Sequence, residues 1–118
     1  MPAPIDTDSG RRHIERFRAP AAIRAELTDL IQQAGSLVWT RPGLAPAHRS
    51  LVTIGVLVAG GQLGPLREHV EIGLANGLTA TEVTEAILQC AVYAGFPRMV
   101  AAMEVAADVL DGAASAKR

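Results

Sequence analysis

Apolar residues recur at helical spacing along most of the chain. From residue 20 to residue 34 they recur every three or four positions, with Pro20 at the start and Gly35 immediately after, which predicts a first helix over 20–34. The stretch from Pro46 to Ala59 is apolar on all sides after Arg49, and such a helix must be enclosed by protein. Its Val, Ile and Thr residues also suit a buried strand, but we choose a helix because the neighbouring elements all have helical patterns.

The second half of the chain predicts three further helices. One spans Pro65–Asn76, with Gly77 as its stop signal. The next begins with a capping box in Thr79–Glu82 and extends to about Ala94, and Pro97 starts the last one. The chain therefore predicts an all-α bundle of about five to six helices.

The size of the chain limits how much apolar surface it can bury alone. With 118 residues it has room for one compact domain, and we assign residues 1–19 to an N-terminal arm, 20–112 to the helical domain and 113–118 to a flexible tail. Small Ala and Gly side chains bury little area each. Since the all-apolar helix up to Ala59 also needs a cover, we expect a homo-oligomer.

Charge and composition exclude several classes of function. Eleven basic and twelve acidic side chains give a net charge of -1, and aromatic residues make up 3%, which disfavours binding to nucleic acid. We expect no membrane partner and a cytoplasmic location, because no apolar leader or spanning stretch is present. Cys90 is the single cysteine, so neither an intramolecular disulfide nor a thiolate zinc cage can form.

Four segments carry a family resemblance. They read WTRPGL at 39–44, RSLVTIGVLVAGGQ at 49–62, LREHV at 66–70 and NGLTATEVTEAILQCAVYAGFP at 76–97. Together they resemble the carboxymuconolactone decarboxylase family over about Trp39 to Leu110. The resemblance implies an alkyl-hydroperoxidase D-like fold assembled as trimers or hexamers, with active sites near subunit contacts. It also implies a carboxy-lyase of aromatic-compound catabolism, because the namesake enzyme decarboxylates 4-carboxymuconolactone without metal or organic cofactor.

Two departures from the family pattern change the expected activity. Peroxidase relatives carry a CxxC motif and then, after three intervening residues, a histidine. If that histidine is His69, Gln62 and Pro65 stand at the cysteine positions. The absence of both cysteines excludes thiol peroxidase chemistry. Namesake decarboxylases have a glutamate two residues before the tryptophan, where this chain has Leu37, and a longer N-terminal region. Leu37 and the shorter N-terminal region favour a relative that acts on another acidic, enolisable substrate, such as one of specialised metabolism.

His69 is the leading candidate for proton transfer. It lies on the flank of the apolar stripe formed by Leu66, Val70 and Gly73, and it belongs to the LREHV motif. A structural histidine is the ordinary alternative for a single His in a helix. The family resemblance favours a functional role, and an ordinary histidine pKa of about 6.5 suits proton transfer at neutral pH.

Other candidates would bind the substrate. Arg49 and Arg41 each offer a planar fork for a carboxylate or oxyanion, with a capping or ion-pair role as the even alternative. Trp39 and Leu37 are assigned to substrate binding, Trp39 as a pocket wall. Tyr93 packs in the core in the simplest interpretation, together with Cys90, but its hydroxyl is also a candidate donor to an oxyanion.

The resemblance implies decarboxylation, or isomerisation, of an acidic unsaturated lactone or similar enolisable substrate through a stabilised enolate. The resemblance implies an activity without a cofactor. We also expect no metal, because no acidic residues stand at metal-ligand spacing beside His69. Two alternatives stay open: a non-catalytic oligomeric member of the family that binds a small molecule, and a specialised-metabolism enzyme with a different substrate.

Overall fold

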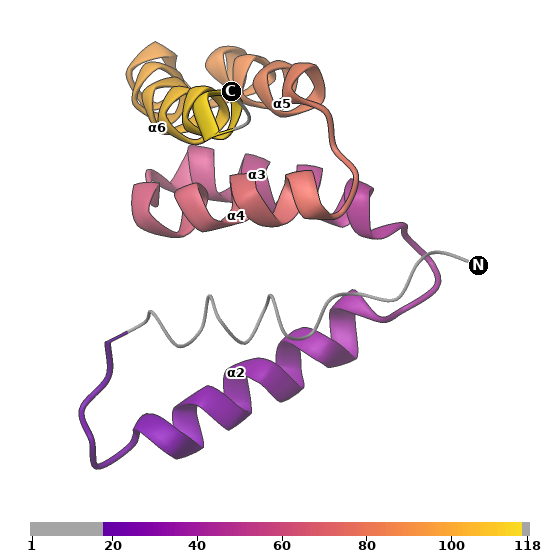
Figure 1. Cartoon of the computed structure of the whole chain (residues 1–118), viewed down its shortest axis with the longest axis vertical. Helices are drawn as coiled ribbons and strands as arrows, with labels where there is room; N and C mark the ends of the chain where they lie inside the picture. The colour runs from indigo at the N-terminus through magenta and orange to yellow at the C-terminus, as the bar shows by residue number, and fades with distance from the viewer. Residues whose placement is uncertain (1–17, 117–118) are drawn as a thin grey trace. The chain divides into compact units, whose positions relative to one another are not determined.

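The computed structural model describes residues 18–116, which contain α-helices and turns but no strand (Figure 1). The all-α prediction is confirmed. Most of the predicted arm, residues 1–17, lies outside the described residues, as do residues 117–118 of the predicted tail. The chain divides into two compact units, residues 1–46 and 47–118. The helices are α2 (Arg24–Trp39), α3 (Pro46–Gly60), α4 (Leu63–Ala75), α5 (Ala80–Ala94) and α6 (Phe96–Ala116).

The helix of the first unit, α2, is shifted along the chain relative to the prediction. It begins at Arg24, whose guanidinium donates to the carbonyl of Ala19 at 2.9 and 3.1 Å, and it ends at Trp39 with Thr40 as its C-cap. Gly35 was expected to end the helix but lies inside it. A glycine costs a helix only about 1 kcal/mol relative to alanine, so the favourable pattern of the following residues continues the helix past it.

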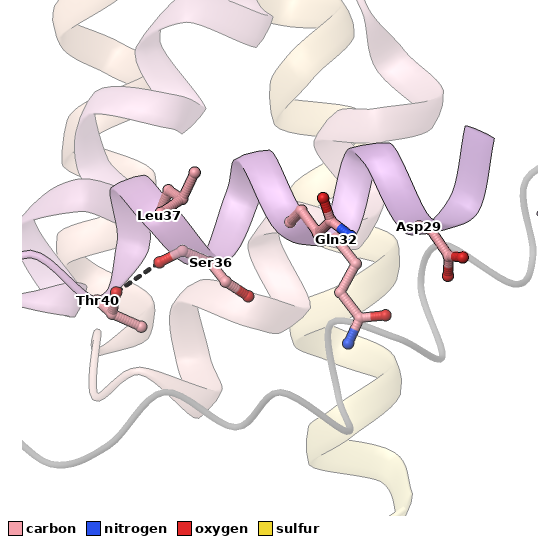
Figure 2. A pocket seen from close by; sticks show the side chains of 6 residues that line it. Asp29, Gln32, Ser36, Leu37 and Thr40 are labelled. Carbon is pink, nitrogen blue, oxygen red and sulfur yellow. Dashed lines mark hydrogen bonds between the residues drawn. The ribbon is translucent and has the colours of Figure 1, made fainter. Parts of the chain in front are cut away.

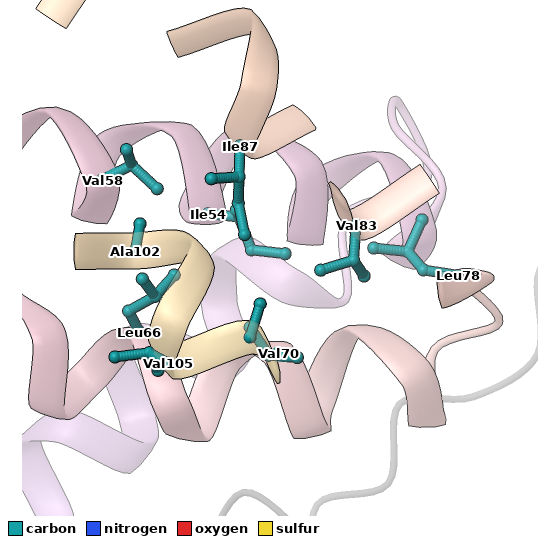
Figure 3. Close-up of a cluster of buried hydrophobic side chains, with 10 residues drawn as sticks. Ile54, Val58, Leu66, Val70, Leu78, Val83, Ile87, Ala102 and Val105 are labelled. Carbon is teal, nitrogen blue, oxygen red and sulfur yellow. The ribbon is translucent and has the colours of Figure 1, made fainter. Parts of the chain in front are cut away.

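The second unit is a four-helix arrangement around one apolar core. Helices α5 and α6 lie side by side and both contact α4 (Figure 1). Helix α3 contributes Ile54 and Val58 to the same core. Apolar side chains from all four helices and from the α4–α5 turn meet in the centre (Figure 3). The buried members are Ile54, Val58, Leu66, Val70, Leu78, Val83, Ile87, Ala102, Val105 and Ala106.

Helix α3 confirms the choice of helix over strand for the all-apolar stretch. Its buried residues Ser50, Ile54 and Val58 recur at intervals of four and occupy one face. Val52 and Val56, on the other side, are 60% and 65% exposed. Within the described residues, therefore, only one face of this helix is enclosed.

The ends of α4 and α5 follow the local sequence signals. The predicted capping box is present: Glu82 N–H donates to Thr79 Oγ1 at 3.1 Å, and Thr79 N–H donates to Glu82 Oε1 at 2.9 Å. Gly77, at φ 103°, ends α4 as predicted. The start of α4 was placed too late, because the helix already begins at Leu63, two residues before Pro65.

A close contact joins the α3–α4 turn to α6. Gly61 has φ 67°, and a Cβ atom at this position would collide with Nη1 of Arg98. The guanidinium of Arg98 therefore lies against the C-terminal end of α3, where the helix dipole favours a cation. The positive backbone angle favours glycine at this position.

Candidate functional site

Helix α4 places His69 at the edge of the core. Leu66 and Val70 are completely buried and Gly73 is buried, while His69, on the flank of this stripe, is half-buried. The Nδ1 atom of His69 is itself buried. The predicted flank position of His69 is confirmed, because its side chain is half-buried beside the completely buried Leu66 and Val70. Gly73 and Asn76 follow His69 by four and seven residues and therefore lie on the same side of the helix.

The same flank of α4 packs against side chains of α3 and of the turn after α4. A Cβ atom on Gly73 would lie 3.6 Å from Cβ of Ser50, 3.6 Å from Cδ1 of Ile54 and 3.0 Å from Cδ1 of Leu78. Ser50 is completely buried, and the side-chain amide of Asn76 donates to its hydroxyl at 3.0 Å. A buried polar contact therefore lies between the two helices, on the side of α4 that carries His69.

Arg49 belongs to the same pair of helices. It is half-buried in the first turns of α3, directly before Ser50, and its carbonyl accepts a hydrogen bond from Thr53 Oγ1 at 2.9 Å. The structure thus assigns Arg49 and His69 to α3 and α4, the two helices linked by the Ser50–Asn76 hydrogen bond. An arginine is permanently charged and suits the recognition of a carboxylate.

Tyr93 lies on the outward face of α5. Its side chain is 84% exposed and is flanked by Val92 and Phe96, which are 77% and 65% exposed. The expectation that Tyr93 packs in the core is therefore wrong, because the inward face of α5 is formed by Val83, Ile87 and Ala91. Cys90, its predicted companion, is half-buried, and burial raises the pKa of the Cys90 thiol.

The first unit holds the other three predicted site residues. Trp39 is half-buried at the end of α2, Arg41 is exposed in the turn that follows, and Leu37 is 74% exposed. Leu37 lines a hollow of about 580 Å³ along α2 (Figure 2). The lining residues are Asp29, Gln32, Gln33, Ser36, Leu37 and Thr40.

The chemistry of this hollow on α2 does not suit an acidic substrate. Its described lining contains one carboxylate, several neutral hydrogen-bonding groups and no cation. A bound carboxylate needs a cationic or strongly donating partner. The α3–α4 pair, with His69 and Arg49, has the better donor set, and we regard that pair as the candidate site.

The buried polar contact of this site was not predicted from the sequence. Ser50 is the one polar member of the buried face of α3, and its partner Asn76 is the C-cap residue of α4. A hydroxyl in an otherwise apolar stripe is a detectable signal, since a buried hydroxyl requires a hydrogen-bond partner. The identity of the partner is decided by the packing of the two helices.

Residues 18–116 contain neither a cluster of metal-binding side chains nor a helix that could span a membrane. No group of three or more His, Cys, Asp or Glu side chains in this range is placed to hold a metal ion. None of the helices in the same range is long and apolar enough to span a membrane.

Comparison with known proteins gives consistent matches. The model of the carboxymuconolactone decarboxylase family matches residues 25–108. The 4-carboxymuconolactone decarboxylase of Acinetobacter baylyi is 50% identical over 72 residues, which cover 61% of this chain and 54% of that protein. The nitrosuccinic acid decarboxylase npaB of Metarhizium robertsii is 38% identical over 76 residues, which cover 64% of this chain and 53% of the relative.

A third relative is an uncharacterized 15.0 kDa protein from the nqo9-nqo10 intergenic region of Paracoccus denitrificans. It is 35% identical over 83 residues, which cover 69% of this chain and 62% of that protein. The chain therefore spans between 53% and 62% of the length of these curated relatives.

Proposed function

This chain belongs to the carboxymuconolactone decarboxylase family, and on that premise we propose that it is a carboxy-lyase that removes CO2 from an acidic, enolisable substrate. The substrate class is a carboxylated unsaturated lactone or a similar small acid. The observation that carries the proposal is the match over residues 25–108, which includes the α3–α4 pair with its histidine and arginine.

The reaction requires a place for the electron pair that CO2 leaves behind. When the C–C bond to the carboxylate breaks in a conjugated lactone, the electron pair moves through the ring alkene to the carbonyl oxygen of the lactone and forms a dienolate. A proton then adds to carbon and gives the enol-lactone. Nitrosuccinic acid, which appears in the name of one relative, carries a nitro group that accepts an electron pair in the same way. An acid with such an electron acceptor is therefore the substrate class we propose.

The residues of the α3–α4 pair have distinct proposed roles. Arg49 contacts the substrate carboxylate or the developing oxyanion, and His69 donates the proton to the dienolate carbon, then recovers a proton from water. A positioned general acid contributes about 10²- to 10⁴-fold to the rate. No cofactor enters this sequence, because the substrate itself accepts the electron pair.

Three residues of the first unit are proposed to bind the substrate. Arg41 is the second candidate for the carboxylate contact, and Trp39 and Leu37 are the candidates for the apolar wall. The indole of Trp39 offers a large apolar surface of the kind that excludes water from a bound ligand.

We also propose that the chain assembles as a homo-oligomer, a trimer or a hexamer. The support is an apolar patch at the junction of α5 and α6, formed by Val92, Tyr93 and Phe96, which are between 65% and 84% exposed. Apolar patches of this kind are typical of protein interfaces, and aromatic residues are enriched in their cores. Because Tyr93 belongs to this proposed interface, its hydroxyl would take part in the reaction only at the active site of a neighbouring subunit.

Light scattering tests the assembly. The wild-type protein is expected to have a mass of at least three times 12.4 kDa, and Val92→Glu is expected to reduce it because a charge would be buried without a partner. Glu104→Gln, at an exposed position of α6, serves as the control. A monomeric wild-type protein at micromolar concentration would contradict the proposal.

A substrate panel tests the activity. CO2 release is measured with 4-carboxymuconolactone, nitrosuccinic acid and several other carboxylated unsaturated lactones, and product NMR in D2O locates the new C–D bond. A saturated carboxylated lactone is the control, because it lacks an acceptor for the electron pair and is expected to remain intact. Saturable binding without turnover of any acid on the panel would instead favour the non-catalytic binding function.

A further inference from the structure

The crossing of α3 and α4 contains a polar contact inside an apolar core. Ser50 is completely buried, and the Nδ2 atom of Asn76 donates to its Oγ atom at 3.0 Å. A buried hydroxyl that loses its partner has no water to replace it, so this hydrogen bond favours one alignment of the two helices over the others. The contact joins residues 26 positions apart in the chain.

Gly73 brings the two helices together at the same place. Its missing side chain leaves space that is filled by Ser50, Ile54 and Leu78, the last at 3.0 Å from the Cβ position. The carbonyl of Gly73 also accepts the N–H of Leu78 at 2.9 Å, which folds the chain back over the end of α4. The last turn of α4 is therefore held both by packing and by hydrogen bonds.

His69 lies on this same flank of α4. It precedes Gly73 by four residues and Asn76 by seven, a span of about 10 Å along the helix axis. An α-helix is stiff over two turns, because each peptide group is hydrogen-bonded to the next turn. Anchoring of the last turn therefore determines the height and rotation at which α4 presents His69.

We propose that Ser50 and Asn76 are positioning residues for His69, and this rests on the proposed function. Ser50 is completely buried, so its proposed role is to position α4 and not to contact the substrate. The pair acts through α4 by locking its register against α3, so that the imidazole lies within reach of the carbon that receives the proton. Gly73 permits the close approach that the hydrogen bond requires.

Three variants test the pair through kinetics. Ser50→Ala, Asn76→Ala and the double variant are compared with wild type, because a misplacement of about 1 Å costs up to about 10²-fold in rate. Each single variant is expected to lower kcat about tenfold or more with KM little changed. The double variant is expected to fall no further than the single ones, because all three lose the same hydrogen bond.

Thr84→Val is the matched control. It removes a helix hydroxyl that donates only within α5, to the carbonyls of Ala80 and Thr81 at 3.0 and 3.1 Å. This variant is expected to keep the wild-type kcat. Additive losses in the double variant, or an equal loss in Thr84→Val, would overturn the positioning role.

An NMR measurement tests the pair without any substrate. The ring cross-peaks of His69, assigned by their absence in His69→Gln, are recorded at one fixed pH for each variant. We expect them to shift in Ser50→Ala and in Asn76→Ala and to stay in place in Thr84→Val. Unmoved His69 peaks in a variant with reduced thermal stability would show that the pair only stabilises the fold. This readout is independent of the proposed activity, so inactivity of the wild type on every acid tested would refute the decarboxylase proposal alone.

Discussion

Replacement of His69 by glutamine separates proton transfer from a structural role. His69 is half-buried on the flank of α4, while the core residues Leu66 and Val70 are completely buried and stay in place. Glutamine has a similar size and retains hydrogen-bonding groups, but it does not carry a proton that it can transfer near neutral pH. The substitution therefore removes the chemistry and keeps most of the packing.

The two effects differ enough in size to be distinguished. Loss of a general acid lowers kcat by about 100-fold, which corresponds to about 2.7 kcal/mol of transition-state stabilisation. A flank substitution that leaves the core intact costs about 1 kcal/mol of folding free energy or less, a Tm decrease of at most about 8 °C. An enzyme that remains folded at 25 °C thus shows the full kinetic loss.

The assay compares kcat of wild type and His69→Gln on an acid that the wild type decarboxylates, with light scattering and circular dichroism as controls for assembly and folding. The kcat–pH profile of the variant is expected to lose the limb that reports the histidine, because its titrating group is gone. A variant with wild-type kcat and a strongly lowered Tm would refute the reasoning. The proton donor would then be sought at Tyr93 or at a bound water molecule.

Further predictions address other residues of the chain. Arg49→Lys keeps the charge but loses the bidentate fork, so we expect steady-state kinetics to show a raised KM with kcat little changed if Arg49 anchors the substrate; a loss confined to kcat would contradict this role. Because burial raises the pKa of the Cys90 thiol, iodoacetamide is expected to react more slowly with it at pH 8 than with a free cysteine peptide. Cys90→Ala and prolonged dialysis against EDTA are both expected to leave most of the turnover; restoration of lost activity by zinc or manganese would disprove the cofactor-free mechanism. Thr79→Ala removes the hydroxyl oxygen that accepts from Glu82 N–H, and denaturant titration is expected to show a loss of about 1 kcal/mol, whereas an unchanged midpoint would mean that the cap contributes nothing.

Local signals in the sequence were sufficient for the helix type and for several helix ends. The capping box at Thr79 and the stop at Gly77 involve residues within a few positions of each other, so the physics that decides them is contained in a short window. The flank position of His69 was also predictable, because helical periodicity alone places it beside Leu66 and Gly73. Local signals failed at three places: α2 begins at Arg24 and not at Pro20, α4 begins at Leu63 and not at Pro65, and Gly35 lies inside α2. At Gly35 the cost of a glycine inside a helix was smaller than the gain from continuing it.

Tertiary structure decided which faces found a partner. Tyr93 is a large aromatic residue of a kind often found in protein cores, yet its side chain is 84% exposed. Helix α5 packs on the core through its opposite face, which carries Ile87. The hydrogen bond from Asn76 to Ser50 could not be predicted from the sequence either. Periodicity gives the face of a helix on which a side chain lies, but not the residue that packs opposite it. Contacts between helices depend on their register and crossing, which are set by the packing of many side chains at once. Ser50 and Ile54 of α3, for example, fill the space that the missing side chain of Gly73 leaves beside α4.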